Sequence, residues 1–188
     1  MKNKTLMLYA FIIMLCFCFA QCKKTKDIPK TELEKLPPIT QTGANTFGCL
    51  VDGVAWLPNG TKPQNGGPNI QVYVDPTFQG GAFYITGHQY NGAYQFVSFG
   101  SYKCTSSGYF ISDSISNNFG YKKTVYGGTN IEYRTPENGF YRKGFFNIKR
   151  YDLISGVFSG IFEVNLYKID GTLGDTIRIT NGRFDVKL

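Results

Sequence analysis

Short apolar runs with a period of two begin at Phe47 and recur to the end of the chain. In the clearest of them, residues 157–167, every second residue from Phe158 to Leu166 is apolar or glycine, and polar residues such as Glu163 lie between them. Alternation of this kind is typical of a β-strand with one face on a core. The pattern therefore predicts a domain built from strands.

Gly, Asn, Asp and Pro separate these runs, and no stretch of helical period joins them. The predicted strands are residues 47–51, 54–56, 70–74, 82–89, 93–99, 109–111, 131–134, 144–150, 157–167, 176–180 and 183–188. Residues 57–69 and 112–120 are predicted to be loops. Short strands without helical crossovers form antiparallel sheets. We therefore expect an all-β domain, an antiparallel β-sandwich in the preferred interpretation and a β-barrel in the alternative.

The N-terminus has the pattern of an export signal. Lys2 and Lys4 precede the uncharged segment Leu6–Ala20, which is too short for a typical membrane-spanning helix. The following Cys22 resembles the lipidated cysteine of a bacterial lipoprotein signal. We therefore predict a signal helix within a signal peptide of residues 1–21, and a lipid attached to Cys22. Cleavage after Ala20, without a lipid, is the alternative.

Residues 22–46 are rich in Lys, Thr and Pro, and Pro37-Pro38 interrupts any helix that begins before it. We predict a flexible tether for this segment and a single β domain for residues 47–188. The first acid after Cys22 is Asp27, which follows three lysines. Signals for export to the cell surface tend to place acids directly after the lipidated cysteine. We therefore expect the protein at the outer membrane, facing the periplasm rather than the cell surface.

Three segments together resemble an uncharacterised family of small Bacteroidota lipoproteins, a domain of unknown function. They are NTFGCLVDGVAW (residues 45–56), FSGIF (residues 158–162) and ITNGRFD (residues 179–185). The resemblance implies an all-β domain behind a lipid anchor. It implies no activity, so no catalytic residue follows from it.

Charge and composition narrow the range of partners. The chain has 16 Phe, 13 Tyr and 22 Gly, a composition typical of strands and turns rather than helices. Removing the signal peptide takes away Lys2 and Lys4 and no acid, so the formal charge falls from +7 to +5. For an exported chain this is a mild charge, and nucleic acid is not an expected partner.

Candidate chemistry is sparse. His88 is the only histidine, and its strand position places it on the face opposite Phe83 and Ile85. Asp170 and Asp175 flank a glycine-rich loop, but they lack the dense acidic spacing of a calcium loop, and a plain hairpin is preferred. We therefore expect no catalytic residue, metal or cofactor, and no enzymatic activity.

Two cysteines remain in the β domain, Cys49 and Cys104. In an oxidising compartment they could form a disulfide that closes a long loop. Cys49 lies between Phe47 and Val51 on the predicted core face, so a buried free thiol is the alternative.

Tyrosines form the remaining candidate for a site. They concentrate in the middle of the chain, at Tyr90, Tyr94, Tyr102, Tyr109, Tyr121, Tyr126, Tyr133 and Tyr141. Exposed rings can stack on sugars or anchor a protein partner, whereas buried rings fill a core, as we expect for Trp56. We therefore expect a non-catalytic, membrane-anchored binding module for a glycan or an envelope protein. A structural or accessory envelope lipoprotein without a small ligand is the alternative.

Overall fold

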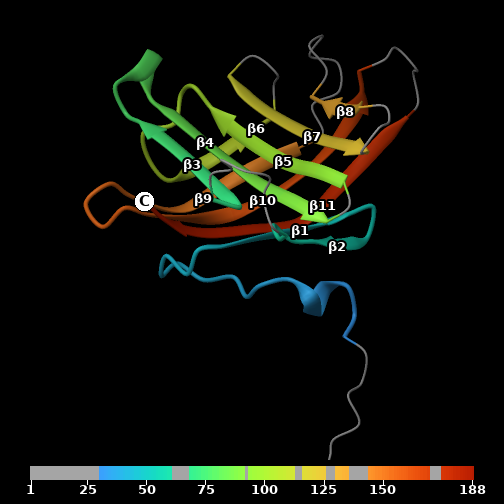
Figure 1. The fold of residues 1–188 in the computed structure, drawn as a ribbon. Coiled ribbons are helices and arrows are strands. Elements are labelled where there is room, and N and C mark those ends of the chain that lie inside the picture. The colour runs from blue at the N-terminus through green and yellow to red at the C-terminus, as the bar shows by residue number, and fades with distance from the viewer. Residues whose placement is uncertain are drawn as a thin grey trace, which may run out of the picture.

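The fold is built almost entirely from strands (Figure 1). The computed structural model describes residues 30–60, 68–91, 93–112, 116–125, 130–135, 144–169 and 175–188. Its elements are the 3₁₀ turns η1 (Leu33–Lys35) and η2 (Phe78–Gly80), and the strands β1 (Thr46–Val51), β2 (Val54–Trp56), β3 (Ile70–Asp75), β4 (Ala82–Asn91), β5 (Ala93–Ser101), β6 (Gly108–Ile111), β7 (Asn117–Val125), β8 (Asn130–Arg134), β9 (Gly144–Asp152), β10 (Val157–Lys168) and β11 (Thr176–Lys187).

All eleven strands belong to one sheet. Its main order is β2-β1-β11-β10-β8-β7-β5-β4-β3, and β9 joins β10 to β6 beside this path. Every strand pair is antiparallel, and an isolated parallel bridge joins Asn59 to Gln89. The prediction of an all-β, antiparallel domain is therefore confirmed. The barrel alternative is wrong, because β2 and β3, at the two ends of the order, do not pair with each other within the described strands.

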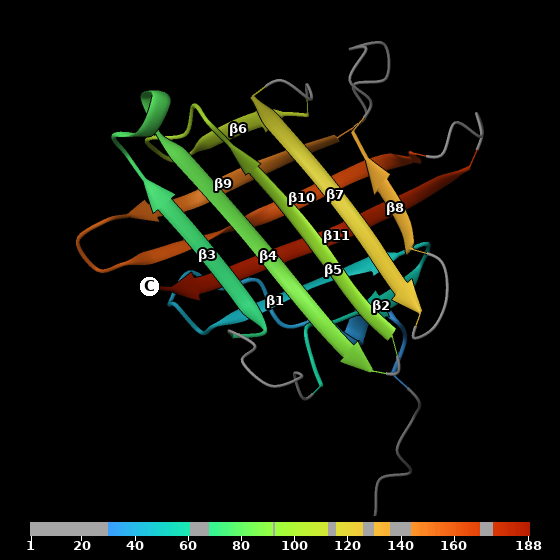
Figure 2. The same cartoon turned by 45° about the horizontal axis from the view of Figure 1, so that its top comes forward.

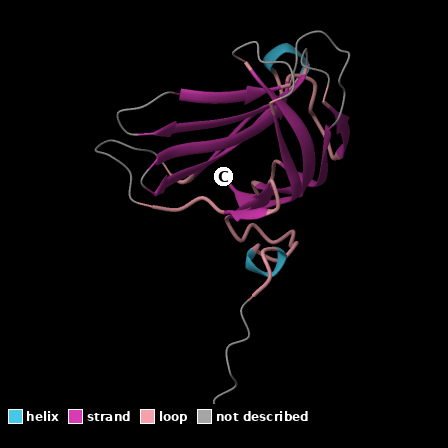
Figure 3. Ribbon diagram, turned by 90° about the vertical axis from the view of Figure 1, so that its right-hand side faces the viewer, coloured by secondary structure: helices cyan, strands magenta, loops and turns pink. Residues whose placement is uncertain are grey.

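The sheet folds over so that its two parts face each other. In Figure 2, β3, β4, β5 and β7 run across β9, β10, β11 and β1 at a large angle. A twisted sheet of this many strands buries its apolar face by curling onto itself. The side view in Figure 3 shows the two layers of strands that result.

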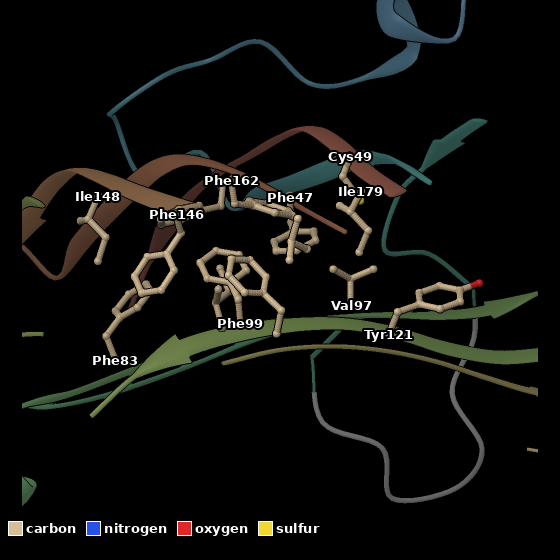
Figure 4. Close-up of a cluster of buried hydrophobic side chains, with 14 of the residues drawn as sticks. Phe47, Cys49, Phe83, Val97, Phe99, Tyr121, Phe146, Ile148, Phe162 and Ile179 are labelled. Atoms are coloured by element: carbon tan, nitrogen blue, oxygen red, sulfur yellow. The ribbon is translucent and has the colours of Figure 1, made fainter. Parts of the chain in front are cut away.

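Phenylalanine rings fill the space between the two layers (Figure 4). Phe83 and Phe99 come from β4 and β5, and they meet Phe47, Phe146 and Phe162 from β1, β9 and β10. All five side chains are buried, and the rings of Phe99 and Phe162 lie only 4.5 Å apart. The alternation predicted for residues 157–167 is confirmed from Gly160 to Leu166, where every second residue is buried, whereas Val157 and Ser159 at the start of β10 are buried as well.

One strand was not predicted, and two predicted strands form one. β7 occupies part of the segment that we predicted to be a loop, residues 112–120. β11 is continuous across Asn181, which has a positive φ of 52°, and the register with β10 shifts at this point. This bulge changes the alternation of β11, so that apolar residues on both sides of it are buried: Ile177, Ile179, Phe184 and Val186.

The described part of the predicted tether, residues 30–46, lies against the outside of the sheet (Figure 1). The buried carboxylate of Asp185 on β11 accepts hydrogen bonds from the backbone N–H groups of Thr42 and Gly43, at 2.9 and 2.7 Å, and from the Thr40 hydroxyl at 2.6 Å. Leu36 is also buried. This part of the segment is therefore docked on the β domain rather than free, because it supplies the partners of a buried charge.

The predicted signal helix, the remainder of the tether and the lipidation site Cys22 lie within residues 1–29, outside the described residues. Among the helices that are described, none is both long and apolar enough to cross a membrane.

Candidate functional site

The outer face of β3, β4, β5, β7 and β8 is the side of these strands that points away from the core. Strand alternation determines its residues. Because Phe83 and Ile85 are buried in the core, the intervening residues Tyr84, Thr86 and His88 of β4 lie on the outer face. Through the register they are joined there by three residues of β5, Phe96, Ser98 and Gly100. This face is rich in aromatic rings, although the opposite face already supplies the core.

The first aromatic group consists of His88, Tyr90, Tyr94 and Phe96. The cross-strand pairs are Tyr90 with Tyr94 and His88 with Phe96. The ring of His88 stacks on that of Tyr94 at an interplanar angle of 14°, and its Nδ1 lies 3.0 Å from the Tyr94 hydroxyl. Burial raises the pKa of Tyr94, and the neighbouring Tyr90 adds to the effect. The four rings therefore form one packed unit on the surface of the sheet.

The second aromatic group consists of Tyr84, Tyr102 and Phe78, with Tyr73 opposite Tyr84 on β3. The ring of Tyr84 meets that of Tyr102 edge-on at 5.1 Å between centroids, and Tyr102 lies 6.1 Å from Phe78. Burial raises the pKa of Tyr84, and Tyr102 reinforces the shift. Tyr73, Tyr102 and Phe78 are exposed, so this group presents ring surface to solvent.

A row of small residues separates the two groups. Thr86 pairs with Ser98, Ser98 with Gly120, and Gly120 with Arg134, so the row crosses four strands. A Cβ placed on Gly120 would meet the Ser98 hydroxyl at 3.2 Å and the ring of Phe96 at 3.8 Å. Because Gly120 has no side chain, the surface is open at this point.

Hollows lie at both ends of this row. Around Gly120 a hollow of about 320 Å³ is lined by Phe96, Ser98, Asn118, Glu132 and Arg134, with Phe119 and Thr135 completing the lining. At the other end, a hollow of about 510 Å³ reaches Tyr73, Tyr84 and Thr86 and continues around the edge of β3 to Ile70, Val72 and Lys187. Rings and hydrogen-bonding side chains therefore border two separate hollows, one near each end of the row.

The hollow around Gly120 contains charged groups of both signs. Arg134 donates to the Glu132 carboxylate from Nε at 2.9 Å and from a terminal guanidinium nitrogen at 2.6 Å. Lys122 lies opposite Glu132 in the register. A carboxylate, a guanidinium and the amide of Asn118 offer planar acceptors and donors beside the ring of Phe96. This combination is suited to binding a polar ligand that has one apolar surface.

The predicted tyrosines divide between several environments. Tyr90, Tyr94 and Tyr102 lie on the outer face, and Tyr109 is exposed on β6, where it stacks on Phe145 at 4.9 Å. Tyr121 is buried, and its ring lies 6.1 Å from that of the half-buried Tyr133. Tyr126 and Tyr141 fall outside the described residues.

The outer face also contains aromatic residues that we did not single out from the sequence: Tyr73, Tyr84 and Phe96. The sequence did contain a signal for them, because each of these residues alternates with core residues along its strand. The hollow around Gly120 gave no such signal, since β7 was not predicted.

His88 lies on the outer face as predicted, but Tyr90 and Tyr94 cover it, and it is only 8% exposed. Asp175 accepts a hydrogen bond from the Tyr133 hydroxyl at 3.1 Å and pairs with Lys168 at 3.5 Å, while Asp170 lies outside the described residues. Within the part of the chain that the structure describes, no three His, Cys, Asp or Glu side chains are grouped to hold a metal ion.

Cys49 and Cys104 are both buried free thiols in the structure, which is the alternative to the disulfide. Burial raises the pKa of both thiols, that of Cys104 to about 12. Trp56 is a core residue, as expected, and its indole N–H donates to the side-chain oxygen of Gln95 at 3.2 Å. The Tyr121 hydroxyl donates to the same oxygen at 2.9 Å.

No protein-family model matches this chain, and neither the curated proteins nor the solved structures gave a significant match. The all-β architecture implied by the resemblance to small Bacteroidota lipoproteins is confirmed. The family itself is not identified by these comparisons.

Proposed function

We propose that this chain is a lipid-anchored, non-catalytic protein of the cell envelope whose outer face binds a glycan. The observation that supports this proposal best is the row of small residues that crosses the outer face from Thr86 to Gly120. It has aromatic groups on both sides and ends in a hollow lined by Phe96, Asn118, Glu132 and Arg134. A protein needs no aromatic rings on the solvent side of a sheet in order to fold, so their concentration there favours a binding role.

The chemistry of sugars matches this surface. A pyranose ring has C–H groups that pack on the face of an aromatic ring, and hydroxyl groups that need planar donors and acceptors at its edge. Neighbouring strands are about 4.8 Å apart, so the row from Thr86 to Arg134 spans roughly 14 Å. A short stretch of a linear glycan would extend over that length, with its edges on the two aromatic groups.

A glycan screen with purified full-length protein in detergent tests the proposal. We expect wild-type protein to bind at least one class of polysaccharide on an array. Tyr94→Ala, which removes a ring of the first aromatic group, should weaken that signal. Tyr109→Ala removes an exposed ring from β6 and serves as the matched control, which should bind like wild type. No binding to any glycan, or equal loss in both variants, would contradict the proposal.

The anchor is a separate part of the proposal. Cys22 would carry a diacylglycerol, and two or three acyl chains would give lasting attachment to the outer membrane, with the domain facing the periplasm. Lys23, Lys24 and Lys26 would lie near the lipid headgroups. We expect Cys22→Ser to leave the membrane fraction or to remain unprocessed in the native host. Normal processing together with retention in the membrane would contradict lipidation.

A further inference from the structure

Among the described residues, the edge strand β3 has no hydrogen-bonding partner on the side that faces away from β4. Its register with β4 is regular, and the N–H of His88 donates to the carbonyl of Asn69 at 2.8 Å. In an antiparallel pair alternate residues bond to the neighbour. Gln71 and Tyr73 therefore bond to β4, and Ile70, Val72 and Val74 direct their N–H and C=O groups away from it. No described residue bonds to those outward groups.

The two edge strands of the sheet differ in how well they are protected from pairing with another strand. At the other end, β2 has only three residues, and the N–H of Ala55 donates to the Glu32 carboxylate of the docked N-terminal segment at 2.8 Å. β3 has six residues, with no proline, no bulge and no charged residue before Asp75. Natural proteins usually block an exposed edge with one of these features, because an open edge pairs with other strands.

Hollows lie along both faces of this edge. The hollow of about 510 Å³ is lined on the outer face by Gln71, Tyr73, Tyr84 and Thr86, and it continues around the edge to Pro68, Ile70, Val72, Lys187 and Leu188. On the core side, a second hollow of about 390 Å³ is lined by Ile70, Val72, Val186 and Lys187, together with Asn45, Pro68 and Asn69. The two hollows share Pro68, Ile70, Val72 and Lys187, so they form one space around the edge. Successive side chains of an added strand point to opposite faces, and they would lie in turn on the side of Tyr73 and on the side of Val186.

We propose that β3 accepts an extended segment of a partner polypeptide as an additional antiparallel strand. The outward N–H and C=O groups of Ile70, Val72 and Val74 would pair with its backbone. Its apolar side chains would alternate with polar ones, so that the apolar set enters the hollow formed by Ile70, Val72 and Val186. An acidic side chain near Lys187 would complement the charge at that end.

A single strand fits this edge better than a second folded copy of the chain. The β9–β10 hairpin projects past β3 on the side of the open edge (Figures 1 and 2). Lys187 and Leu188, at the end of β11, border the same hollow. A second copy that paired through its own β3 would bring a second hairpin to the same place. An isolated extended peptide has no such bulk.

Peptide display tests this proposal and can be carried out while the partner is still unidentified. Random nonapeptides would be selected on full-length protein, and each enriched peptide would be measured against wild type and two variants. Val72→Pro removes an N–H that bonds to no described residue, a change that an edge strand tolerates. Val72→Ala keeps this N–H and trims the side chain, so it controls for lost packing. Circular dichroism and thermal melting would confirm that both variants fold.

We expect enriched peptides to alternate apolar and polar residues and to bind Val72→Pro at least tenfold more weakly than Val72→Ala. Each enriched peptide would also be made in two methylated forms, one with N-methyl groups on its odd-numbered residues and one with them on its even-numbered residues. Only the form whose methyl groups replace the N–H groups that face β3 should lose binding. A failure to enrich any peptide would overturn the proposal. Equal binding by Val72→Pro and Val72→Ala would also overturn it, as would unchanged binding of both methylated forms of the peptide. None of these results depends on glycan binding.

Discussion

Phe99 lies at the centre of the core that joins the two layers. Its ring centroid is within 6.5 Å of six other phenylalanine rings, those of Phe47, Phe83, Phe119, Phe146, Phe162 and Phe184. These rings come from both parts of the folded sheet, so a single side chain connects strands that are not hydrogen-bonded to each other. Packing around such a residue is sensitive to loss of volume.

We predict that Phe99→Ala lowers the free energy of unfolding by about 3–5 kcal/mol, because it removes a buried ring and leaves a cavity. Urea denaturation followed by circular dichroism measures the change. The exposed Tyr109 provides the comparison, and Tyr109→Ala should change stability by less than about 1 kcal/mol. Similar losses in the two variants would show that Phe99 is not central to packing.

The buried thiols lead to a second prediction at this scale. The pKa values of Cys49 and Cys104 are raised in the folded protein by burial, so the unfolded chain loses these protons at lower pH. The protonated thiols therefore contribute fully to the free energy of unfolding below about pH 8.5, and this contribution is lost as pH rises toward 12. We expect the melting temperature to fall above pH 9, with a shallower decline in the Cys49→Ala, Cys104→Ala double variant. Parallel declines would contradict this account.

Among the elements, β11 and the docked segment of residues 30–46 depend on each other. Burial alone would raise the pKa of Asp185, but hydrogen bonds from Thr40, Thr42, Gly43 and Ala44 outweigh it, and the pKa lies below its usual value. The Asp185 side chain therefore holds a segment that precedes it by about 140 positions. In addition, the guanidinium of Arg183 donates to the carbonyl of Pro37 at 3.1 Å.

We predict that Asp185→Asn destabilises the protein by about 1.5–3 kcal/mol at pH 7, because hydrogen bonds to a charged acceptor are lost. A carboxyl with a lowered pKa stabilises the fold above its unfolded value, near pH 4, and this contribution disappears as pH falls through the folded value. The difference in the free energy of unfolding between the variant and wild type should therefore shrink below pH 4. Faster hydrogen exchange at Thr42 and Gly43 would identify the released segment. Unchanged exchange in the variant would contradict the role of Asp185.

The elements also show how far the sequence alone could be interpreted. Strands with several apolar residues on one face, such as β10, were predictable from their period. β7 was not, because Asn117, Asn118 and the pair Lys122-Lys123 obscure the alternation of Phe119 and Tyr121. The bulge at Asn181 was interpreted as a break between strands, since Asn-Gly is also a turn signal. In both places the pairing with neighbouring strands decides whether the segment is a strand, and this pairing cannot be deduced from a single sequence.

The same limit applies to the candidate site. Tyr90, Tyr94 and Tyr102 could be named from the sequence because tyrosine is frequent in this part of the chain. The hollow around Gly120 could not, because it depends on Ser98 and Arg134 lying on either side of Gly120 in three paired strands. The docked state of residues 30–46 was also not predictable, since its partners lie near the opposite end of the chain.

On the scale of the whole molecule, the aromatic face and the N-terminal segment lie on opposite sides. Residues 30–46 lie outside the layer that contains β1 and β11, and the outer face belongs to the layer of β4 and β5 (Figures 1 and 3). A chain anchored through Cys22 would then present the aromatic groups away from the membrane. The open edge of β3 lies beside the second aromatic group, and the proposed glycan and peptide would share the hollow of about 510 Å³.

The affinity of a retained glycan for wild type and for Gly120→Val is the most direct test of glycan binding at the outer face. Gly120 does not have a positive φ, so the backbone accepts a β-branched residue, which would shift the Ser98 hydroxyl that lies 3.2 Å from the added Cβ and would fill part of the hollow. Isothermal titration should show at least tenfold weaker binding, equivalent to about 1.4 kcal/mol, with Tyr109→Ala unchanged. If Gly120→Val folds normally and binds the glycan as tightly as wild type, the outer face is not the binding site.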